Sequence, residues 1–147
     1  MVKDEEPQIG YLLKRAQSVL HTRMDEALRP HGLSVSQYVC LHFLNREPGI
    51  SAAELARSAF VTRQSMNTLL QGLQDRGLVE RPARPASGRA LPAVVTAAGA
   101  AVLSEAEKAV DGVERQMLSG LDRSGTTALG SALRRCTAAL EGEERSP

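Results

Sequence analysis

The fold of this chain follows most directly from Ser51 to Thr96, which read SAAELARSAFVTRQSMNTLLQGLQDRGLVERPARPASGRALPAVVT. Ser51 predicts the start of a short helix, because its hydroxyl can cap the first turn and Glu54 can complete a capping box. Thr62 predicts the N-cap of a second helix, and Gly77 predicts where that helix ends. The stretch therefore begins with two short helices in succession.

The second of these helices has an apolar stripe and a polar face. The stripe recurs at helical spacing and consists of Met66, Leu69, Leu70 and Leu73. The side chains that fall mostly off it are Arg63, Gln64, Asn67, Thr68, Gln71 and Gln74. Asparagine and glutamine match the base edge of adenine and arginine matches guanine, so this face suits the major groove. The alternative is an ordinary polar surface, because short helix pairs are common.

The segment after Gly77 predicts a β-hairpin with a basic tip. Residues 78–81 and 91–95 each favour a short strand, and a loop that contains proline and glycine joins them. In the second strand, Leu91, Ala93 and Val95 are expected to lie on one face. The arginines of this hairpin are Arg81, Arg84 and Arg89. A helix that reads bases in the major groove is called a recognition helix, and a hairpin beside it is called a wing. A basic wing can reach phosphates or the minor groove, where arginine is favoured. The alternative for these arginines is a solvated turn.

Positive charge is concentrated in the same region. The whole chain has 18 basic and 17 acidic residues, so its net charge says nothing about partners. Residues 57–89 carry six arginines and two acids, a local charge of +4, whereas residues 90–147 carry six basic and eight acidic residues, or −2. A polyanionic partner requires such a concentration, so a winged helix-turn-helix that binds double-stranded DNA is the favoured interpretation.

Composition favours one mostly α-helical domain. The chain has 147 residues, 3% aromatic residues and no tryptophan, which leaves the core to leucine, valine and alanine. No apolar run approaches the length of a membrane span and no signal peptide opens the chain, so we expect a cytoplasmic protein without a membrane partner. The motifs of hydrolases, zinc proteases, P-loop proteins and dinucleotide-binding enzymes are missing, so we do not expect an enzyme.

Further helices are predicted before and after the winged region. They span residues 9–29, 35–45, 97–119 and 123–140. The expected N-terminal caps of the last three are Ser34 with Gln37 as its capping-box partner, Thr96 and Asp122. The first and the last two carry more apolar surface than one small core needs, which favours a dimer interface. The expected organisation is a flexible arm at 1–8, a dimerisation helix at 9–33, the winged DNA-binding region at 34–96, C-terminal dimerisation helices at 97–140 and a tail at 141–147.

Several short runs of residues occur in a characteristic order and spacing. They are His31-Gly32-Leu33-Ser34 with Gln37, Leu41 and Leu44, then Ser51-Ala52-Ala53-Glu54-Leu55-Ala56, then Arg76-Gly77-Leu78-Val79-Glu80-Arg81, and finally Arg89-Ala90-Leu91 and Val95-Thr96-Ala97-Ala98-Gly99. Together they resemble the MarR-type winged helix-turn-helix transcriptional regulators over about residues 9–140. Two positions depart from that family: Ser87 stands where it usually has aspartate, and Pro92 is rare in its wing strand. The resemblance implies a homodimer on a palindromic operator that a small molecule often releases.

The expected DNA contacts come from the second helix and the wing. They are Thr62, Arg63, Gln64, Ser65, Asn67 and Thr68 in the major groove, with Arg84 and Arg89 in the wing. A dimer would place its two recognition helices one DNA turn apart, ~34 Å, on a pseudo-palindromic operator.

An effector pocket is implied by the resemblance. It would lie among the first two helices, the start of the long helix after the wing and the DNA-binding lobe. The positions here are Tyr11, Arg15, Tyr38 and His42. Tyrosine and arginine can hold a small anionic or aromatic effector by stacking and a charge-assisted bond. The alternative is that all four are packing and surface residues.

The chain has two cysteines, which allow an alternative function: a thiol-based redox regulator of the same fold. Cys40 lies on the side of its helix expected to face inward, which favours a small buried hydrophobe over a sensor. Cys136 follows Arg134 and Arg135, which can favour a thiolate. The three histidines lack metal-ligand spacing, so we expect neither metal nor cofactor. A dimeric protein-interaction module that does not bind DNA is the remaining alternative, which Ser87 and the modest charge leave open.

Overall fold

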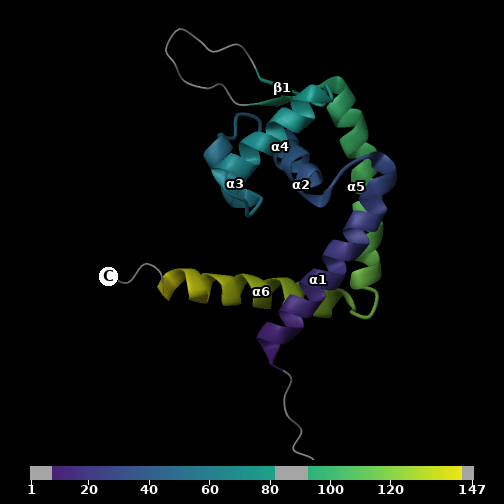
Figure 1. Ribbon diagram of the computed structural model, residues 1–147. Helices are drawn as coiled ribbons and strands as arrows, with labels where there is room; N and C mark the ends of the chain where they lie inside the picture. Colours follow the sequence, from purple (N-terminus) through teal and green to yellow (C-terminus); the bar gives the residue numbers. More distant parts are fainter. Residues whose placement is uncertain (1–7, 82–92, 144–147) are drawn as a thin grey trace, which may run out of the picture. The chain divides into compact units, whose positions relative to one another are not determined.

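The computed structural model describes residues 8–81 and 93–143, and the chain divides into two compact units. The first unit, residues 1–113, contains α1 (Ile9–Leu28), a 3-10 turn η1 (Arg29–His31), α2 (Val35–Arg46), α3 (Ala52–Ser58), α4 (Arg63–Asp75), β1 (Val79–Glu80), β2 (Val94–Val95) and most of α5 (Ala97–Met117). The second, residues 114–147, contains the end of α5 and α6 (Arg123–Glu143). The chain is mostly helical with one small hairpin, as predicted (Figure 1).

Helices α2 and α3 begin at the predicted caps. Ser34 and Gln37 form a complete capping box before α2: the Ser34 Oγ accepts from the Gln37 N–H at 3.1 Å, and the Gln37 Oε1 accepts from the Ser34 N–H at 3.0 Å. The Ser51 Oγ accepts from the Glu54 N–H at 3.1 Å and so begins α3. A cap of this kind stabilises a helix by about 0.5–2 kcal/mol, so the sequence specifies these starts locally.

An aliphatic core holds α2, α3 and α4 together. Its most completely buried side chains come from elements throughout the first unit: Leu28, Cys40, Leu41, Leu55, Met66, Leu73, Val79 and Leu103. Among the buried side chains that the structure describes, Tyr38 is the one aromatic residue, at 7% exposure. Burying one leucine side chain contributes about 1.5–3 kcal/mol, so these contacts fix which side of each short helix faces solvent.

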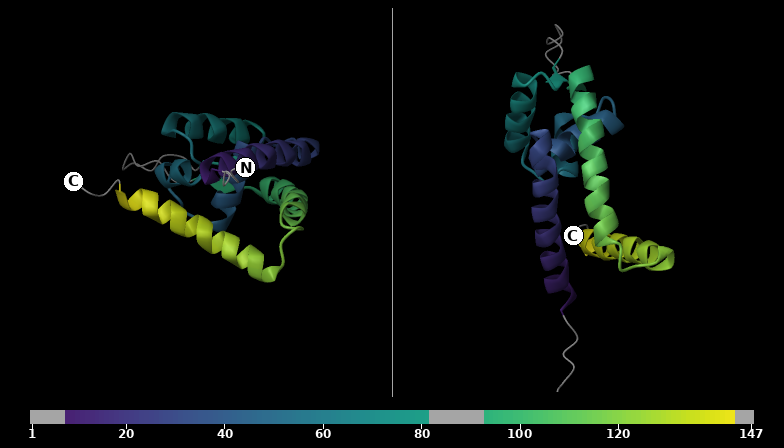
Figure 2. Two further views of the ribbon diagram at one scale, coloured as in Figure 1. Left: turned by 90° about the horizontal axis from the view of Figure 1, so that it is seen from below. Right: turned by 90° about the vertical axis from the view of Figure 1, so that its right-hand side faces the viewer.

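The N-terminal half of α1 extends away from the cluster of α2, α3 and α4 (Figures 1 and 2). Its one fully buried residue is Leu28, at the end that meets the core. The apolar side chains nearer its start are exposed, and they include Ile9, Leu12, Leu13 and Val19. Most of the predicted apolar stripe of this helix is therefore uncovered in a single chain.

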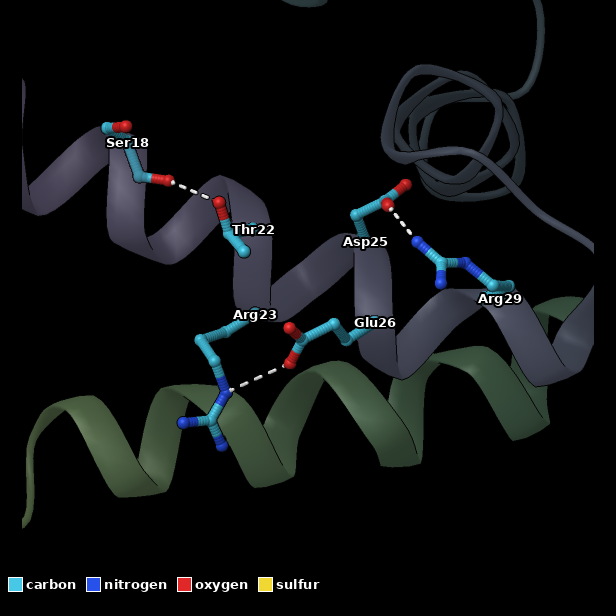
Figure 3. Close-up of polar contacts among 6 residues, drawn as sticks. All are labelled: Ser18, Thr22, Arg23, Asp25, Glu26 and Arg29. Carbon is cyan, nitrogen blue, oxygen red and sulfur yellow. Dashed lines mark hydrogen bonds and ion pairs between the residues drawn. The ribbon is translucent and has the colours of Figure 1, made fainter.

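Polar contacts within α1 and at its C-terminal end link neighbouring turns of the chain (Figure 3). The Arg29 Nη2 lies 2.9 Å from the Asp25 Oδ2, and the Arg23 Nε lies 3.6 Å from the Glu26 Oε2. Pairs at this spacing contribute about 0.2–0.5 kcal/mol each to an isolated helix, so they support α1 only modestly. None of the helices that the structure describes is both long and apolar enough to cross a membrane.

The hairpin is antiparallel, with Val79 opposite Val95 and Glu80 opposite Val94. Both strands lie within the predicted ranges 78–81 and 91–95, but each has two residues among those described. Ala93 is buried and Val94 is exposed, in agreement with the predicted alternation. Residues 82–92, including Leu91 and Pro92, lie outside the described part of the chain.

Thr96 joins the hairpin to α5. Its Oγ1 donates to the Gly77 carbonyl at 2.7 Å and accepts from the Gly99 N–H at 3.0 Å, which is the predicted N-cap. The Thr96 N–H also donates to the Leu78 carbonyl at 3.0 Å. A Cβ on Gly99 would overlap the Leu78 carbonyl oxygen, so this close approach requires glycine. The helix ends at Met117, two residues before the predicted Ser119.

The second unit consists mainly of α6. The Asp122 Oδ1 accepts from the Gly125 N–H at 2.7 Å and is the predicted cap. The helix runs to Glu143, three residues beyond the predicted end at residue 140, since none of residues 141–143 is a proline that would stop it. No residue of α6 whose side chain is described is buried.

Candidate nucleic-acid interface

Helices α3 and α4 are joined by a tight turn at residues 59–62. The Phe60 N–H donates to the Arg57 carbonyl at 3.3 Å, and the Val61 N–H donates to the Ala56 carbonyl at 3.0 Å. Phe60 has a φ of 57°, a left-handed conformation that is rare for residues other than glycine. Its side chain is 94% exposed. The turn therefore supplies hydrogen-bond donors to carbonyl groups at the end of α3. In return, Phe60 adopts a strained backbone conformation with its side chain in solvent.

Both ends of α4 are formed as predicted. The Thr62 Oγ1 accepts from the Ser65 N–H at 3.0 Å at its start. At its end, Gly77 has a φ of 72°, and the Leu78 N–H donates to the Leu73 carbonyl at 3.0 Å. The second contact belongs to a Schellman motif, in which a left-handed glycine lets the chain leave the helix. These caps fix α4 between the turn and the hairpin.

One side of α4 is buried and the other faces solvent. Met66, Leu70 and Leu73 are buried, and Leu69 is half-buried. All of the polar side chains predicted for the other face are exposed, namely Arg63, Gln64, Asn67, Thr68, Gln71 and Gln74. A shallow open hollow on this face is lined by Gln64, Asn67, Thr68, Gln71, Gly72 and Asp75. The face predicted to read base edges is thus available to a partner.

Two amide side chains on this face contact charged residues. The Arg81 Nη2 donates to the Asn67 Oδ1 at 3.3 Å, which links the end of β1 to α4. The Gln71 Nε2 donates to the Asp75 Oδ1 at 2.9 Å, one helical turn further on. Neither contact was predicted from the sequence. The contact between Gln71 and Asp75 could have been predicted from their spacing, since residues i and i+4 are neighbours on a helix.

Hydroxyl groups near the start of α4 are also engaged within the helix. The Thr62 Oγ1 donates to the Ser65 Oγ at 2.9 Å, and the Thr68 Oγ1 donates to the Gln64 carbonyl at 3.2 Å. Arg63, also proposed as a DNA contact, is exposed beside them. The structure therefore places these five predicted contact residues together at the start of one exposed helix.

The tip of the wing lies outside the described residues. Arg84, Ser87 and Arg89 all fall within residues 82–92, so their predicted positions stay predictions. Arg81, which directly follows β1, is exposed beside α4. The described part of the hairpin thus begins next to the polar face of α4.

The four residues proposed for an effector pocket lie in two places. Tyr38 and His42 are neighbours on α2, with ring centroids 5.9 Å apart. The His42 Nδ1 lies 3.3 Å from the Glu107 Oε1, which connects α2 to α5. Tyr11 and Arg15 are exposed on the N-terminal half of α1. That half of the helix extends away from α2 (Figure 1). Within one chain, the structure brings together the pair on α2.

The two cysteines differ in their surroundings. Cys40 is fully buried, and its Sγ lies 3.7 Å from the Met66 Sδ. Burial raises the pKa of its thiol to about 12, an effect that the charge of Arg81 partly opposes. Cys136 is exposed on α6. A thiolate is the reactive form, so the buried position opposes a sensor role for Cys40. In the described part of the chain, no three His, Cys, Asp or Glu residues are grouped to hold a metal.

Comparisons with known proteins agree with this architecture. A model of the MarR family matches residues 31–90. The HTH-type transcriptional repressor Rv2887 of Mycobacterium tuberculosis is 48% identical over 118 residues, which cover 80% of this chain and 84% of that protein. The chain belongs to the MarR family.

Solved structures of a MarR-family protein support the same assignment. The structure of Mycobacterium tuberculosis Rv2887 in complex with DNA has a TM-score of 0.74 to this chain, at 39% identity over 89% of this chain and 98% of that one. Its complex with salicylic acid has a TM-score of 0.73, at 42% identity over 90% and 98%. The region that matches the MarR family model, residues 31–90, includes α2, α3, α4 and β1, which carry the interface described above.

Proposed function

We propose that this chain is a ligand-responsive transcriptional repressor that binds a pseudo-palindromic DNA operator as a homodimer. The exposed polar face of α4, held outward by its buried stripe, is the observation that carries the proposal. The similar Rv2887 is named a transcriptional repressor and has been solved with DNA. Membership of a family of transcriptional regulators supports a regulatory role rather than catalysis. It also supports a location in the cytoplasm, the compartment that holds the chromosome.

In this proposal α4 enters the major groove. Arg63, Gln64, Ser65, Asn67 and Thr68 would contact base edges, and Thr62 would lie at the start of the helix near the backbone. Arg84 and Arg89 would contact the minor groove or phosphates from the wing. The local charge of +4 over residues 57–89 supports attraction to the phosphate backbone.

The proposed dimer uses the helices on either side of the winged region. We assign residues 34–96 to DNA binding and residues 9–33 and 97–140 to dimerisation. The exposed apolar residues of α1 and α6 support this division, because apolar stripes of this length are normally covered by a partner. Two copies would then present their α4 helices about one DNA turn apart, ~34 Å.

The proposed effector is a small aromatic anion. Rv2887 has been solved with salicylic acid, and this chain has tyrosine, arginine and histidine at the positions named above. We propose that Tyr38 and His42 form one wall of the site and that Arg15 supplies the charge that an anion needs, with Tyr11 beside it. Binding would favour a dimer whose α4 spacing does not fit the operator, which would release DNA.

Gel-shift titration with the promoter region of the chain's own gene tests the central proposal. We expect Asn67→Ala to lower operator affinity by about 1–3 kcal/mol and to relax the preference at one base pair. Asn45→Ala is the matched control, since Asn45 is an exposed asparagine at the end of α2. Affinity should also fall steeply with added salt. Weak, salt-independent retention of the DNA would instead favour a protein-interaction module.

A further inference from the structure

The contacts of Asn67 and Gln71 decide which atom of each amide faces outward. Asn67, Gln71 and Asp75 follow each other at intervals of four residues, so they form one row along α4. Arg81 contacts the first of these residues from the end of β1, and Asp75 contacts the second. The three residues of the row line the hollow on the exposed face.

The chemistry of the two charged neighbours leaves one orientation for each amide. A guanidinium has five N–H donors and no acceptor, so the atom of Asn67 that faces Arg81 must be the amide oxygen. An ionised carboxylate only accepts, so the atom of Gln71 that faces Asp75 must be the amide nitrogen. Asn67 therefore turns its Nδ2 donor away from Arg81, and Gln71 turns its Oε1 acceptor away from Asp75.

We propose that Arg81 and Asp75 are positioning residues that set the base preference of α4 by orienting these two amides. The inference rests on the proposed function and adds a chemical rule for the half-site. The donor of Asn67 fits an acceptor-bearing edge, such as the O6 or N7 of guanine or the O4 of thymine. The acceptor of Gln71 fits an amino group, the N4 of cytosine or the N6 of adenine.

This rule differs from the bidentate amide–adenine pairing that the sequence alone favours. Bidentate pairing requires the oxygen and the nitrogen of one amide to face the same base. In Asn67 the oxygen is directed to Arg81, and in Gln71 the nitrogen is directed to Asp75. Each amide consequently reads a single group, and the two amides read groups of opposite kind.

Selection of preferred sequences from a pool of random DNA duplexes tests the rule. The wild-type protein and the variants Arg81→Ala, Arg81→Lys and Asp75→Asn would be compared, with melting temperature measured for each. We expect Arg81→Ala to lower the preference at the base pair facing Asn67 about tenfold. Without the guanidinium, the Asn67 amide can rotate and exchange the places of its oxygen and nitrogen. Arg81→Lys keeps a charged donor and should restore that preference.

For Asp75→Asn, the expected changes in affinity and in base preference differ from those that a general loss of binding would cause. It replaces an obligate acceptor with a group that can accept or donate, so Gln71 can adopt either orientation. It also removes a negative charge from the face of α4 that is proposed to approach the DNA. We expect affinity for random-sequence duplex to rise while the preference at the base pair facing Gln71 falls about tenfold.

Arg57→Ala is the control for loss of charge alone, because Arg57 is an exposed arginine on α3. It should weaken binding to all duplexes without changing the selected sequence. If Arg81→Ala and Asp75→Asn select the wild-type sequence with unchanged preference at every position, the inference is wrong while the proposed function stands. If the wild-type protein selects no sequence at all, both the proposed function and the inference fail.

Discussion

Cys40 and Cys136 belong to the same residue type but have opposite environments. Cys40 is enclosed by the core against Met66, and burial raises its pKa to about 12 from an ordinary value of 9.0. Cys136 is exposed on a helix outside that core. Removal of a thiolate from water is unfavourable, so the buried thiol stays protonated at neutral pH. Of the two, only the exposed cysteine has the access that redox sensing requires.

Thiol labelling at pH 8 is expected to distinguish the two residues. A maleimide should modify Cys136 in the folded protein and Cys40 only after unfolding, as followed by mass spectrometry with Cys136→Ser as the control. The unfolded thiol ionises near pH 9.0 and the folded one near pH 12. Because the unfolded state loses its proton first, rising pH between these values should lower the free energy of unfolding. Equal labelling of both cysteines in the folded protein would contradict the burial of Cys40.

Phe60 is expected to store strain that glycine would release. Its φ of 57° places its Cβ near the following carbonyl oxygen, and the exposed ring gains no core contact in return. Phe60→Gly should be more stable than Phe60→Ala by about 1 kcal/mol, because both remove the ring but only glycine tolerates this φ. Urea denaturation of the two variants measures the difference. An alanine variant as stable as the glycine variant would show that the turn is not strained.

At the scale of elements, two glycines in helices have different reasons to be there. Gly99 lies where the first turn of α5 approaches the Leu78 carbonyl too closely for a side chain. Gly72, in the middle of α4, has open space at the position that a Cβ would take, with no atom within 4 Å beyond its chain neighbours and the surrounding backbone of its own helix. The first glycine is required by the junction between the hairpin and α5. The second is unfavourable for the helix by about 0.5–1 kcal/mol relative to alanine, with no packing reason to offset it.

The same substitution at these two glycines should have opposite effects on stability. Gly99→Ala should lower the free energy of unfolding by about 1–3 kcal/mol, because the added methyl group displaces α5 from β1. Gly72→Ala should raise it by about 0.5–1 kcal/mol, because alanine favours the helix and meets open space. Chemical denaturation with both variants provides the comparison, and equal effects of the same sign would refute the close approach at Gly99.

At the scale of the whole molecule, the proposed dimer explains helices that one chain leaves uncovered. Leu129, Leu133 and Leu140 recur at helical spacing on α6, and all three are exposed. Exposed apolar residues in such a row are favourable only when another surface removes them from water. A second copy of the chain is the partner that a pseudo-palindromic operator requires.

Leu133→Glu is expected to convert the dimer into a monomer. A carboxylate in an apolar interface loses its hydration without gaining a partner, so association should weaken by several kcal/mol, about a hundredfold or more. Thr127→Glu, on the opposite side of the same helix, is the matched control. Sedimentation velocity reports the oligomeric state, and gel shift reports operator binding, which should fall with the dimer. A dimeric Leu133→Glu protein would assign the interface elsewhere.

The sequence by itself determined the local features of this protein. Ser34, Ser51, Thr62 and Asp122 cap helices through residues three positions further on, so their roles can be read from neighbouring residues. The polar face of α4 was equally predictable, because helical periodicity separates it from the buried stripe. The end of α6 was not, since a few polar residues do not stop a helix without a breaking residue.

Only the tertiary structure decided which distant residues meet. His42 and Glu107 are 65 positions apart, and Asn67 is joined to Arg81 across the boundary between a helix and a strand. The burial that raises the pKa of Cys40 likewise depends on all the helices around it. Such contacts are set by how the elements pack, and local propensity and periodicity carry no information about them. The orientation of the two amides, and with it the proposed base preference, therefore belongs to the folded molecule.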